Sequence, residues 1–237
     1  METSMITLDR LDNDLAGWLA RTLVAPGVLS PEAFEAAFVA VVTAAADDPD
    51  EAWLAFYRNT LHALETGARV SGTCAEIAPV HVRAAELAVG TDVVELGCCF
   101  GFLSLRLAAA GHGVTALDLV PGTAALLARM SRRLGRPVDA LAADATAVPL
   151  ASRSADTVFA VHLLEHLSPA AGEQVLAEML RVARRRVVVA VPFEAEPDRT
   201  WGHVRRFDLD ALRALGRATA RPFEVSEHHG GWLVIDL

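Results

Sequence analysis

The segment HLLEHL, residues 162–167, holds three side chains able to do chemistry: His162, Glu165 and His166. On a helix, positions i, i+3 and i+4 share one face, so the three groups would lie within about one turn of each other. Imidazole and carboxylate groups bind divalent cations, and imidazole also exchanges protons near neutral pH. The spacing therefore suggests a metal site or a proton-transfer site, or else an ordinary helix start with polar side chains in solvent.

The composition is that of a globular chain. Its 237 residues are 53% hydrophobic, which suits one large α/β domain or one domain with a helical extension. The net charge is −9 and all 21 basic residues are arginine, which argues against broad binding of nucleic-acid phosphates. The densest basic run, Arg184–Arg186, is expected at a solvated helix end that precedes a strand. Nucleic acid is thus a disfavoured partner.

No apolar run reaches the length of a membrane span, and residues 1–15 lack the basic and apolar pattern of a secretion signal. The three cysteines, two of them adjacent at Cys98 and Cys99, do not suggest a disulfide framework. We therefore expect a soluble, cytoplasmic protein without a membrane partner. The sequence predicts no oligomeric state.

Residues 1–88 contain no convincing strand and predict a helical cap or lid. SPEAFEAAFVAVVTAA begins with Ser30 as a candidate N-cap, followed by proline at the first helical position. DDPDEAWLAFYRNTLHALETG predicts a second helix that starts at its aspartates and ends at Gly67. A third helix is expected over about 74–88, despite the proline within it.

From residue 91 onward, expected strands alternate with expected helices. Strands are predicted at DVVELG, GVTALDL, PVDALAAD, ADTVFAV and RVVVAVP, and PFEVSEHH and GWLVIDL predict a closing hairpin around Gly230 and Gly231. Strand–helix alternation implies right-handed βαβ crossovers and a parallel sheet. We therefore expect an α/β, Rossmann-like domain over 89–237, with a seven-stranded, mostly parallel sheet and an antiparallel terminal hairpin.

The first expected strand runs into a glycine-containing turn, VVELGCCFGF. In a parallel sheet, ligands bind beyond the carboxyl ends of the strands. Gly97 and Gly101 let the backbone approach such a ligand closely. A dinucleotide fingerprint would read G-x-G-x-x-G, but Cys99 stands at its second glycine and the last glycine is displaced. This disfavours a nicotinamide oxidoreductase.

The same turn resembles motif I of the class I S-adenosylmethionine-dependent methyltransferases, acidic-x-G-x-G-x-G. It stands here as Glu95-Leu-Gly97-Cys-Cys99-Phe-Gly101, and the likeness covers roughly residues 88–237. The resemblance implies the class I methyltransferase fold and S-adenosylmethionine as cofactor. It places the cofactor beside Glu95, Gly97, Cys99 and Gly101. Cys99 replaces the usual middle glycine, and this replacement bears on the backbone angles of the loop at that position.

Acidic residues at the ends of the next two strands extend the resemblance. Asp118, which ends the second expected strand in TALDL and precedes Leu119, is placed to accept two hydrogen bonds from a ribose diol. In the family, the position of Asp144 faces the adenine amino group, and the next residue, Ala145, lines the ring. His162 follows the fourth strand, where the family places a residue near the methionine moiety. Either aspartate alone would also suit a turn or an N-cap.

HLLEHL follows the fourth strand, where the chain resembles ubiquinone-pathway O-methyltransferases and the methyltransferases of small-RNA 3′ ends. Both carry E-x-x-E-H and use it with a divalent cation. The resemblance implies a metal site of His162, Glu165, His166 and His203, the last from WGHVRRFD. Three imidazoles and one carboxylate suit Zn, Mn or Fe better than Mg. A cation there would orient vicinal hydroxyls and lower the pKa of one.

Two alternatives to a metal stay open. Glu165 and His166 are consistent with a helix start that packs beneath the cofactor, and His203 with a residue that only orients its loop. His162, His166 or His203 would otherwise act as a catalytic base that takes a hydroxyl proton without a metal.

Further aromatic and histidine residues are expected to be structural. Trp53 and Tyr57 stand at i and i+4 of a predicted helix, so core packing is favoured over stacking on a ligand. His228 and His229 are expected in a solvated hairpin turn.

The pattern of ELGCCFGFLSL, HLLEHL, VPFE, GHVRRFD and EHHGGWLV also resembles the methyltransferases encoded with mycofactocin biosynthesis in actinobacteria. That resemblance implies O-methylation of a sugar or oligosaccharide, on a glucose hydroxyl of the cofactor's glycan. The alternatives are a phenol or quinone O-methyltransferase, an RNA 3′-end 2′-O-methyltransferase and a non-catalytic adenosylmethionine-binding protein.

Overall fold

The computed structural model describes residues 6–67 and 69–237, which form two compact units. The first unit is the described part of Met1–Pro79 together with Asp198–Gly202. The second unit is Val80–Pro197 together with His203–Leu237. One boundary falls inside a helix, and the other two flank a short loop.

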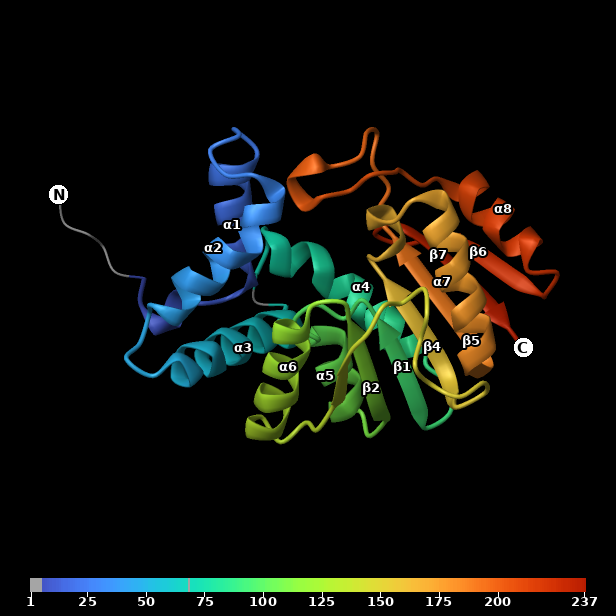
Figure 1. Ribbon diagram of the computed structural model, residues 1–237, viewed down its shortest axis with the longest axis horizontal. Coiled ribbons are helices and arrows are strands. Elements are labelled where there is room, and N and C mark those ends of the chain that lie inside the picture. Colours follow the sequence, from blue (N-terminus) through green and yellow to red (C-terminus); the bar gives the residue numbers. More distant parts are fainter. Residues whose placement is uncertain (1–5, 68) are drawn as a thin grey trace. The chain divides into compact units, whose positions relative to one another are not determined.

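The first unit is helical, and no described residue before Asp92 forms a strand, as predicted. Its elements are η1 (Leu8–Arg10), α1 (Asn13–Leu19), the π-helical turn η2 (Ala20–Val24), α2 (Pro31–Thr43), α3 (Pro49–Thr66), the first half of α4 (Thr73–Leu87) and η4 (Arg199–Trp201) (Figure 1). The predicted caps are confirmed. The Ser30 hydroxyl accepts the N–H of Ala33, and Gly67 ends α3 with a left-handed φ of 64°.

Aromatic rings from α2 and α3 form the core of the first unit. Phe38, Trp53, Phe56 and Tyr57 are nearly inaccessible to solvent. Their rings meet mostly edge to face, with the Phe38 and Phe56 centroids 5.5 Å apart. The prediction that Trp53 and Tyr57 are core residues is confirmed.

The second unit is an α/β domain. Its elements are the rest of α4, β1 (Asp92–Leu96), α5 (Phe102–Ala109), β2 (Gly113–Asp118), α6 (Pro121–Arg133), β3 (Asp139–Ala142), β4 (Ala155–Val161), η3 (Leu164–His166), α7 (Pro169–Val182), β5 (Ala183–Val191), α8 (Leu209–Ala218), β6 (Phe223–Glu227) and β7 (Gly231–Asp236). The strand order is β3-β2-β1-β4-β5-β7-β6. β1 to β5 pair in parallel, whereas β7 is antiparallel to both of its neighbours. The predicted seven-stranded sheet is confirmed.

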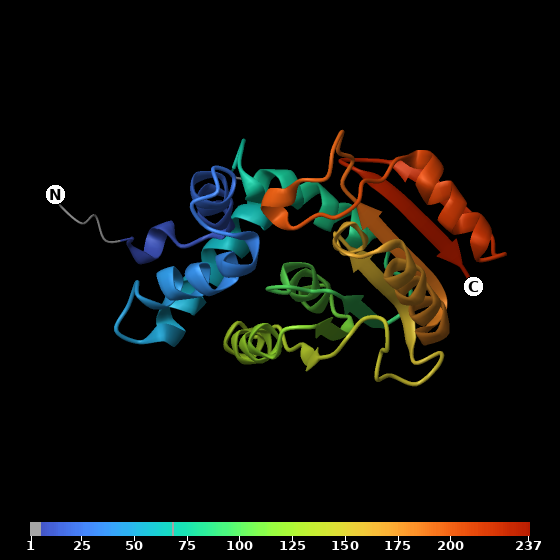
Figure 2. The ribbon, with the colours of Figure 1, turned by 45° about the horizontal axis from the view of Figure 1, so that its top comes forward.

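The sheet is covered on both faces. From β1 the chain moves outward to β2 and β3 and then returns to β4 and β5, so right-handed crossovers place the two sets of helices on opposite faces. Figure 2 shows α7 and α8 across the sheet from α5 and α6. The central strands are accordingly continuous apolar runs, such as Val187–Val191, which is almost fully buried.

One predicted element is wrong. The basic run RRR was expected to end a helix, but it lies in the first half of β5, which follows α7 without a loop. Arg184 donates to Asp92 at 2.6 Å and to Asp156 at 3.1 Å, and Arg186 donates to Asp236 at 2.8 Å. Carboxylates on β1, β4 and β7 therefore pair with arginines that the local sequence alone assigns to a helix end.

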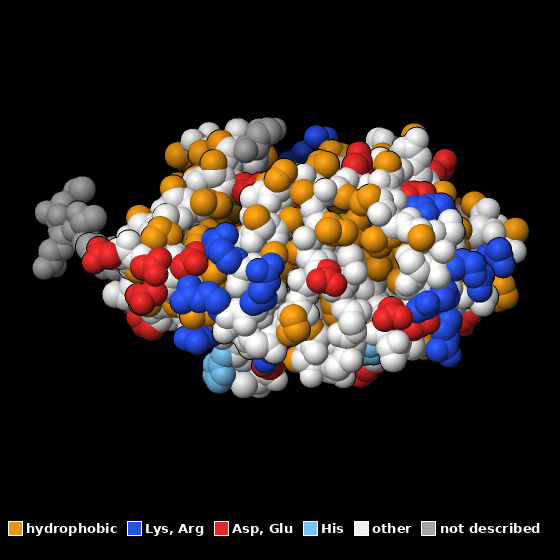
Figure 3. Space-filling view, turned by 60° about the horizontal axis from the view of Figure 1, so that its bottom comes forward, with side chains coloured by type: hydrophobic (Ala, Val, Ile, Leu, Met, Phe, Trp, Pro, Cys, Tyr) orange, Lys and Arg blue, Asp and Glu red, His pale blue; other side chains and the backbone are white. Residues whose placement is uncertain are grey.

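The surface carries both signs of charge. Arginine and acidic side chains are interspersed on the face drawn in Figure 3. Among the described residues, no helix is long and apolar enough to span a membrane.

Candidate active site

β1 to β5 are parallel, so their carboxyl ends meet at one edge of the sheet. The residues predicted to bind a ligand or to do chemistry lie near these strand ends or in the segments that follow them. The β6–β7 turn lies at the same edge, because Gly231 pairs with Val191 at the end of β5. His228 and His229 occupy that turn and are exposed, as expected.

The turn after β1 is shaped by left-handed backbone at Gly97 (φ 70°), Cys99 (φ 49°) and Gly101 (φ 74°). A Cβ at Gly97 would lie 2.7 Å from the Leu163 side chain, and one at Gly101 would lie 2.4 Å from Leu127. The left-handed angles favour glycine at both positions, and a side chain there would also have to displace a leucine. Cys99 is exposed and takes a left-handed backbone angle, a conformation that favours glycine.

Asp118 ties this turn to the end of β2. Its two carboxylate oxygens accept the N–H groups of Cys99 at 2.8 Å and Val120 at 2.9 Å. The side chain is half-buried and the neighbouring Leu119 is 71% exposed. A carboxylate oxygen accepts more than one hydrogen bond, so Asp118 keeps acceptor capacity for a diol.

Asp144 follows β3 and is exposed. Its Oδ1 accepts both the N–H of Thr146 at 2.8 Å and the Thr146 hydroxyl at 2.7 Å, and these hydrogen bonds hold the pKa of Asp144 below its usual value. The aspartate therefore forms the turn, with Ala145 half-buried beside it. Contacts of this pair with an adenine ring stay a prediction.

Glu95 lies beneath the turn and is only 4% exposed. Its carboxylate accepts a hydrogen bond from the Ser104 hydroxyl on α5. Burial raises the pKa of Glu95 to about 7. In this structure Glu95 therefore joins β1 to the helix that follows the turn, and its contact with a cofactor stays a prediction.

HLLEHL does not form a helix, contrary to the i, i+3, i+4 interpretation. His162 takes a left-handed φ of 53°, Leu164–His166 is a single 3₁₀ turn, and α7 begins only at Pro169 with Ser168 as its cap. His162 donates its backbone N–H to Ala190 on β5, which continues the sheet pairing past the end of β4. The strand thus extends its hydrogen bonding to the residue where a helix was expected.

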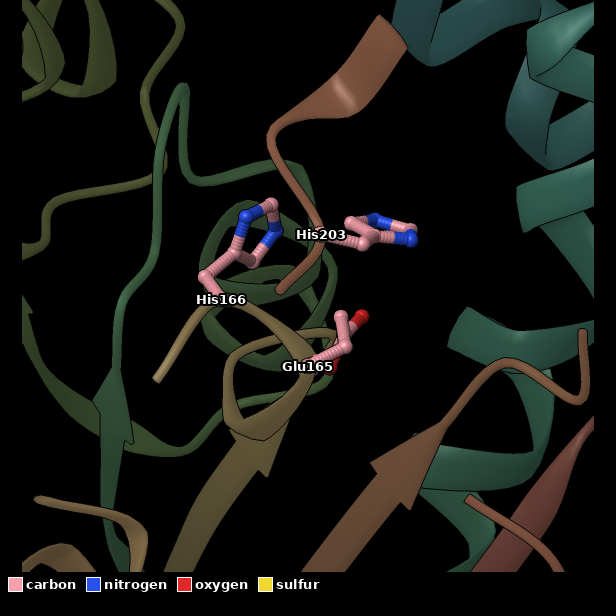
Figure 4. Close-up of side chains that lie close together, drawn as sticks. All are labelled: Glu165, His166 and His203. Carbon is pink, nitrogen blue, oxygen red and sulfur yellow. The ribbon is translucent and has the colours of Figure 1, made fainter. Parts of the chain in front are cut away.

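The structure nevertheless brings Glu165, His166 and His203 together, with one candidate ligand atom of each within 4.8 Å of the others (Figure 4). The Glu165 carbonyl accepts the N–H groups of Val204 at 2.9 Å and Arg205 at 3.3 Å. These two hydrogen bonds dock the GHVRRFD segment on the turn after β4. The rings of His166 and His203 consequently meet edge to face at 4.8 Å.

Glu165 is the buried member of this Glu–His cluster. It is 1% exposed, and neither carboxylate oxygen has a hydrogen-bond partner among the described residues. Burial raises its pKa to about 8, and the nearby charge of Glu194 adds to the rise. A buried carboxylate without a donor is unfavourable unless it meets a proton or a cation.

His162 lies outside the cluster of three ligand atoms, so the expected four-residue set is not assembled. It is half-buried, and burial followed by the charges of His203 and His166 lowers its pKa to about 4. His162 therefore stays neutral at physiological pH, close enough to the cluster to feel its charge.

Two residues near this site were not predicted from the sequence. Glu194 follows β5 in VPFE, and its carboxylate oxygens lie 2.8 and 2.9 Å from Nδ1 of His203. Its position after a strand was a usable signal, since the other acidic candidates were found in that way. His81 on α4 is buried, and its Nδ1 has no hydrogen-bond partner within 6–67 and 69–237. Burial, with the charge of His162, lowers its pKa to about 3. No local pattern marked His81.

Residues 94–191 match the family model described as a methyltransferase domain. No curated protein sequence matches the chain. A solved S-adenosylmethionine-dependent methyltransferase from Aquifex aeolicus is 17% identical, with a TM-score of 0.56 over 74% of this chain and 96% of that one. The magnesium protoporphyrin IX methyltransferase of Synechocystis PCC 6803, with its S-adenosylmethionine bound, is 16% identical, with a TM-score of 0.52 over 76% of this chain and 92% of its own.

A protein with a different activity shares this fold. The [4+2]-cyclase SpnF is 22% identical, with a TM-score of 0.55 over 68% of this chain and 62% of that one. At such identities the structures establish the fold alone. Residues 94–191 are a methyltransferase domain by the family match, in a fold that solved S-adenosylmethionine-dependent methyltransferases share.

Proposed function

We propose that the domain is an O-methyltransferase that transfers the methyl group of S-adenosylmethionine to a sugar hydroxyl. The observation that carries this proposal is the Glu–His cluster of Glu165, His166 and His203, at the edge of the sheet where the motif I turn lies. Methyl transfer is an in-line displacement, in which positioning of the two reactants dominates. A hydroxyl acceptor must also lose its proton, and the cluster supplies groups that promote this loss.

A sugar hydroxyl must lose its proton as it attacks, whereas many nitrogen acceptors need no strong base. Proton transfer to a positioned side chain contributes typically ~10²- to 10⁴-fold in rate. His166 is exposed and therefore accessible to an acceptor, and the half-buried His162 is kept neutral by its lowered pKa. Either imidazole is thus a candidate proton acceptor in the absence of a metal.

The residues present also fit a divalent cation. Glu165 offers two buried carboxylate oxygens that accept no hydrogen bond from the part of the chain that the structure describes, and His166 and His203 offer imidazole nitrogens nearby. One carboxylate and two imidazoles suit Zn or Mn better than Mg. A cation in this position would hold two vicinal hydroxyls and lower the pKa of one of them.

A vicinal diol of glucose in an oligosaccharide is the acceptor that we propose, in line with the resemblance to mycofactocin-associated methyltransferases. A phenol or quinone is the alternative small-molecule acceptor, and a catechol offers the same pair of vicinal hydroxyls. An RNA 3′ end offers it as well, but the net charge of −9 and the interspersed charges of Figure 3 disfavour RNA.

The test is transfer of labelled methyl groups from S-adenosylmethionine to glucosides, glucans, catechols and RNA 3′ ends, with and without a chelator. We expect sugar methylation that a chelator abolishes and that Mn²⁺ or Zn²⁺ restores. Sugar methylation that is insensitive to chelator would retain the histidine base and reject the cation. Methylation of catechols alone would reject the sugar acceptor. Cofactor binding without transfer to any hydroxyl would overturn the proposal.

Substitutions in the Glu–His cluster test whether its side chains take part in methyl transfer. Glu165→Gln and His203→Gln are each expected to lower kcat by ~10²-fold or more while leaving the Kd for S-adenosylmethionine within about twofold. The matched control is His112→Gln, because His112 lies before β2, at the opposite edge of the sheet. Equal losses in the control and in the cluster variants would mean that the cluster has no specific role.

A further inference from the structure

Glu194 makes a short polar contact in the site, although the sequence assigned it no role there. Both of its carboxylate oxygens lie within 3 Å of His203 Nδ1, at 2.8 and 2.9 Å. The His203 side chain is almost fully buried, and the Glu194 side chain is mostly buried. This contact joins the segment after β5 to the GHVRRFD segment, which itself docks on the Glu165 carbonyl.

The chemistry of the contact determines which ring nitrogen carries the proton. An ionised carboxylate only accepts hydrogen bonds, so Nδ1 of His203 has to be the donor. In a neutral imidazole the other nitrogen, Nε2, then keeps its lone pair. That lone pair is the group that binds a cation or accepts a proton from a hydroxyl.

The segment that carries Glu194 is itself held in place. The preceding residue, Phe193, forms a parallel bridge with Phe207, just before α8. A Cβ added at Gly231 would lie only 2.3 Å from the Phe193 ring, so the β6–β7 hairpin packs closely against that ring. Glu194 is therefore supported by two neighbouring elements rather than by its own loop.

We infer that Glu194 is the positioning residue of the Glu–His cluster: it fixes His203 as the Nδ1–H tautomer and directs the Nε2 lone pair to the ligand shared with Glu165 and His166. This inference rests on the proposed function for the identity of that ligand. Carboxylate partners of this kind orient metal-binding histidines, and their loss typically lowers metal affinity or activity ~10–100-fold. Glu194 acts through His203 and need not touch the acceptor.

Two substitutions separate the hydrogen bond from the charge. Glu194→Gln keeps an oxygen acceptor and removes the charge, whereas Glu194→Leu removes both at similar size. Glu196→Leu is the matched control, because Glu196 lies two residues further along the same segment and is exposed. Circular dichroism and thermal unfolding identify any variant that fails to fold.

The first readout is the tautomer of His203, from ¹H–¹⁵N spectra of the imidazole rings, with the resonance assigned by its loss in His203→Gln. We expect the Nδ1–H tautomer in the wild type, in Glu194→Gln and in Glu196→Leu, and a shift toward Nε2–H in Glu194→Leu. A wild-type ring in the Nε2–H form, or a tautomer unchanged in Glu194→Leu, would overturn the inference.

The second readout is binding of Mn²⁺ alone, together with kcat for methyl transfer. Glu194→Leu is expected to weaken Mn²⁺ binding and lower kcat ~10–100-fold, Glu194→Gln less so, with the Kd for S-adenosylmethionine unchanged. Equal losses in Glu196→Leu would remove the specific role of Glu194. If the tautomer responds as expected while the wild type methylates no hydroxyl, the proposed function fails and the orienting role of Glu194 stands.

Discussion

At the scale of single residues, the site concentrates unusual backbone angles. Cys99 after β1 and His162 after β4 both take left-handed φ angles, although neither is glycine. For a residue with a Cβ, that conformation costs about 1–2 kcal/mol. The surrounding hydrogen bonds, from Cys99 N–H to Asp118 and from His162 N–H to Ala190, keep both residues in place. Strain of this kind is typical of functional sites.

Cys99→Gly tests this strain directly. Glycine adopts the left-handed region without a steric penalty, so we expect the free energy of unfolding to rise by about 0.5–1 kcal/mol. S-adenosylmethionine binding should persist, because the loop angles do not change. Urea unfolding of Cys99→Gly beside Cys99→Ala measures the effect. The alanine variant should match the wild type, since it keeps the Cβ, and a glycine variant no more stable than alanine would contradict the prediction.

Glu95 predicts a pH dependence of stability. Its pKa rises from an ordinary value near 4.5 to about 7 in the folded chain, because burial disfavours the carboxylate. The folded chain therefore binds more protons than the unfolded chain between these values, so this contribution to stability falls as pH rises from about 4.5 to 7. Glu95→Gln keeps an acceptor for Ser104 and removes the titration. Relative to wild type, the variant should gain up to about 3 kcal/mol across that window.

Urea unfolding of wild type and Glu95→Gln at a series of pH values isolates the contribution of Glu95 to the free energy of unfolding. Other buried groups titrate equally in both proteins, so they cancel in the difference. A difference that stays constant from pH 4 to pH 8 would show that the Glu95 carboxylate is not destabilised by burial.

At the scale of elements, the β6–β7 hairpin is fitted closely to the end of β5. A Cβ at Gly230 would lie 2.5 Å from the backbone oxygen of Val191, and its φ of 130° also strains any other residue. Gly230→Ala should therefore lower stability by about 2 kcal/mol or more, since backbone cannot move aside as a side chain can. Gly113→Ala, with ordinary φ and no contact closer than 3.4 Å, is the control, and similar unfolding midpoints for the two would refute the account.

Elements with local signals were predictable, but contacts between distant segments were not. Alternating apolar runs and caps such as Ser168 predicted the strands and α7. The acidic residues near the ends of β1, β2 and β3 were found from their order along the chain. The docking of Val204 and Arg205 on the Glu165 carbonyl joins distant segments, so no local pattern shows it. The backbone hydrogen bond from His162 to Ala190 on β5 is likewise a contact between distant segments. Asp12, the cap of α1, was overlooked in a segment without strong periodicity.

At the scale of the whole molecule, the residues predicted to bind the cofactor all belong to the second of the two compact units. Ligand binding stabilises the folded state by about 2.7 kcal/mol at a free concentration 100-fold above Kd. For a chain of this length, that corresponds to a rise of roughly 5–10 °C in the midpoint of thermal unfolding. S-adenosylmethionine should produce this rise, and NAD should not. A rise with NAD but none with S-adenosylmethionine would overturn the cofactor assignment.

The strand order also constrains how the chain folds. β6 is made before β7, yet β7 fills the place next to β5 and β6 lies at the outer edge. During synthesis, β5 therefore presents an unpaired side, and β6 has no strand to pair with until β7 arrives. Until β7 is in place, β5 is therefore an open sheet edge of the kind that pairs with other chains.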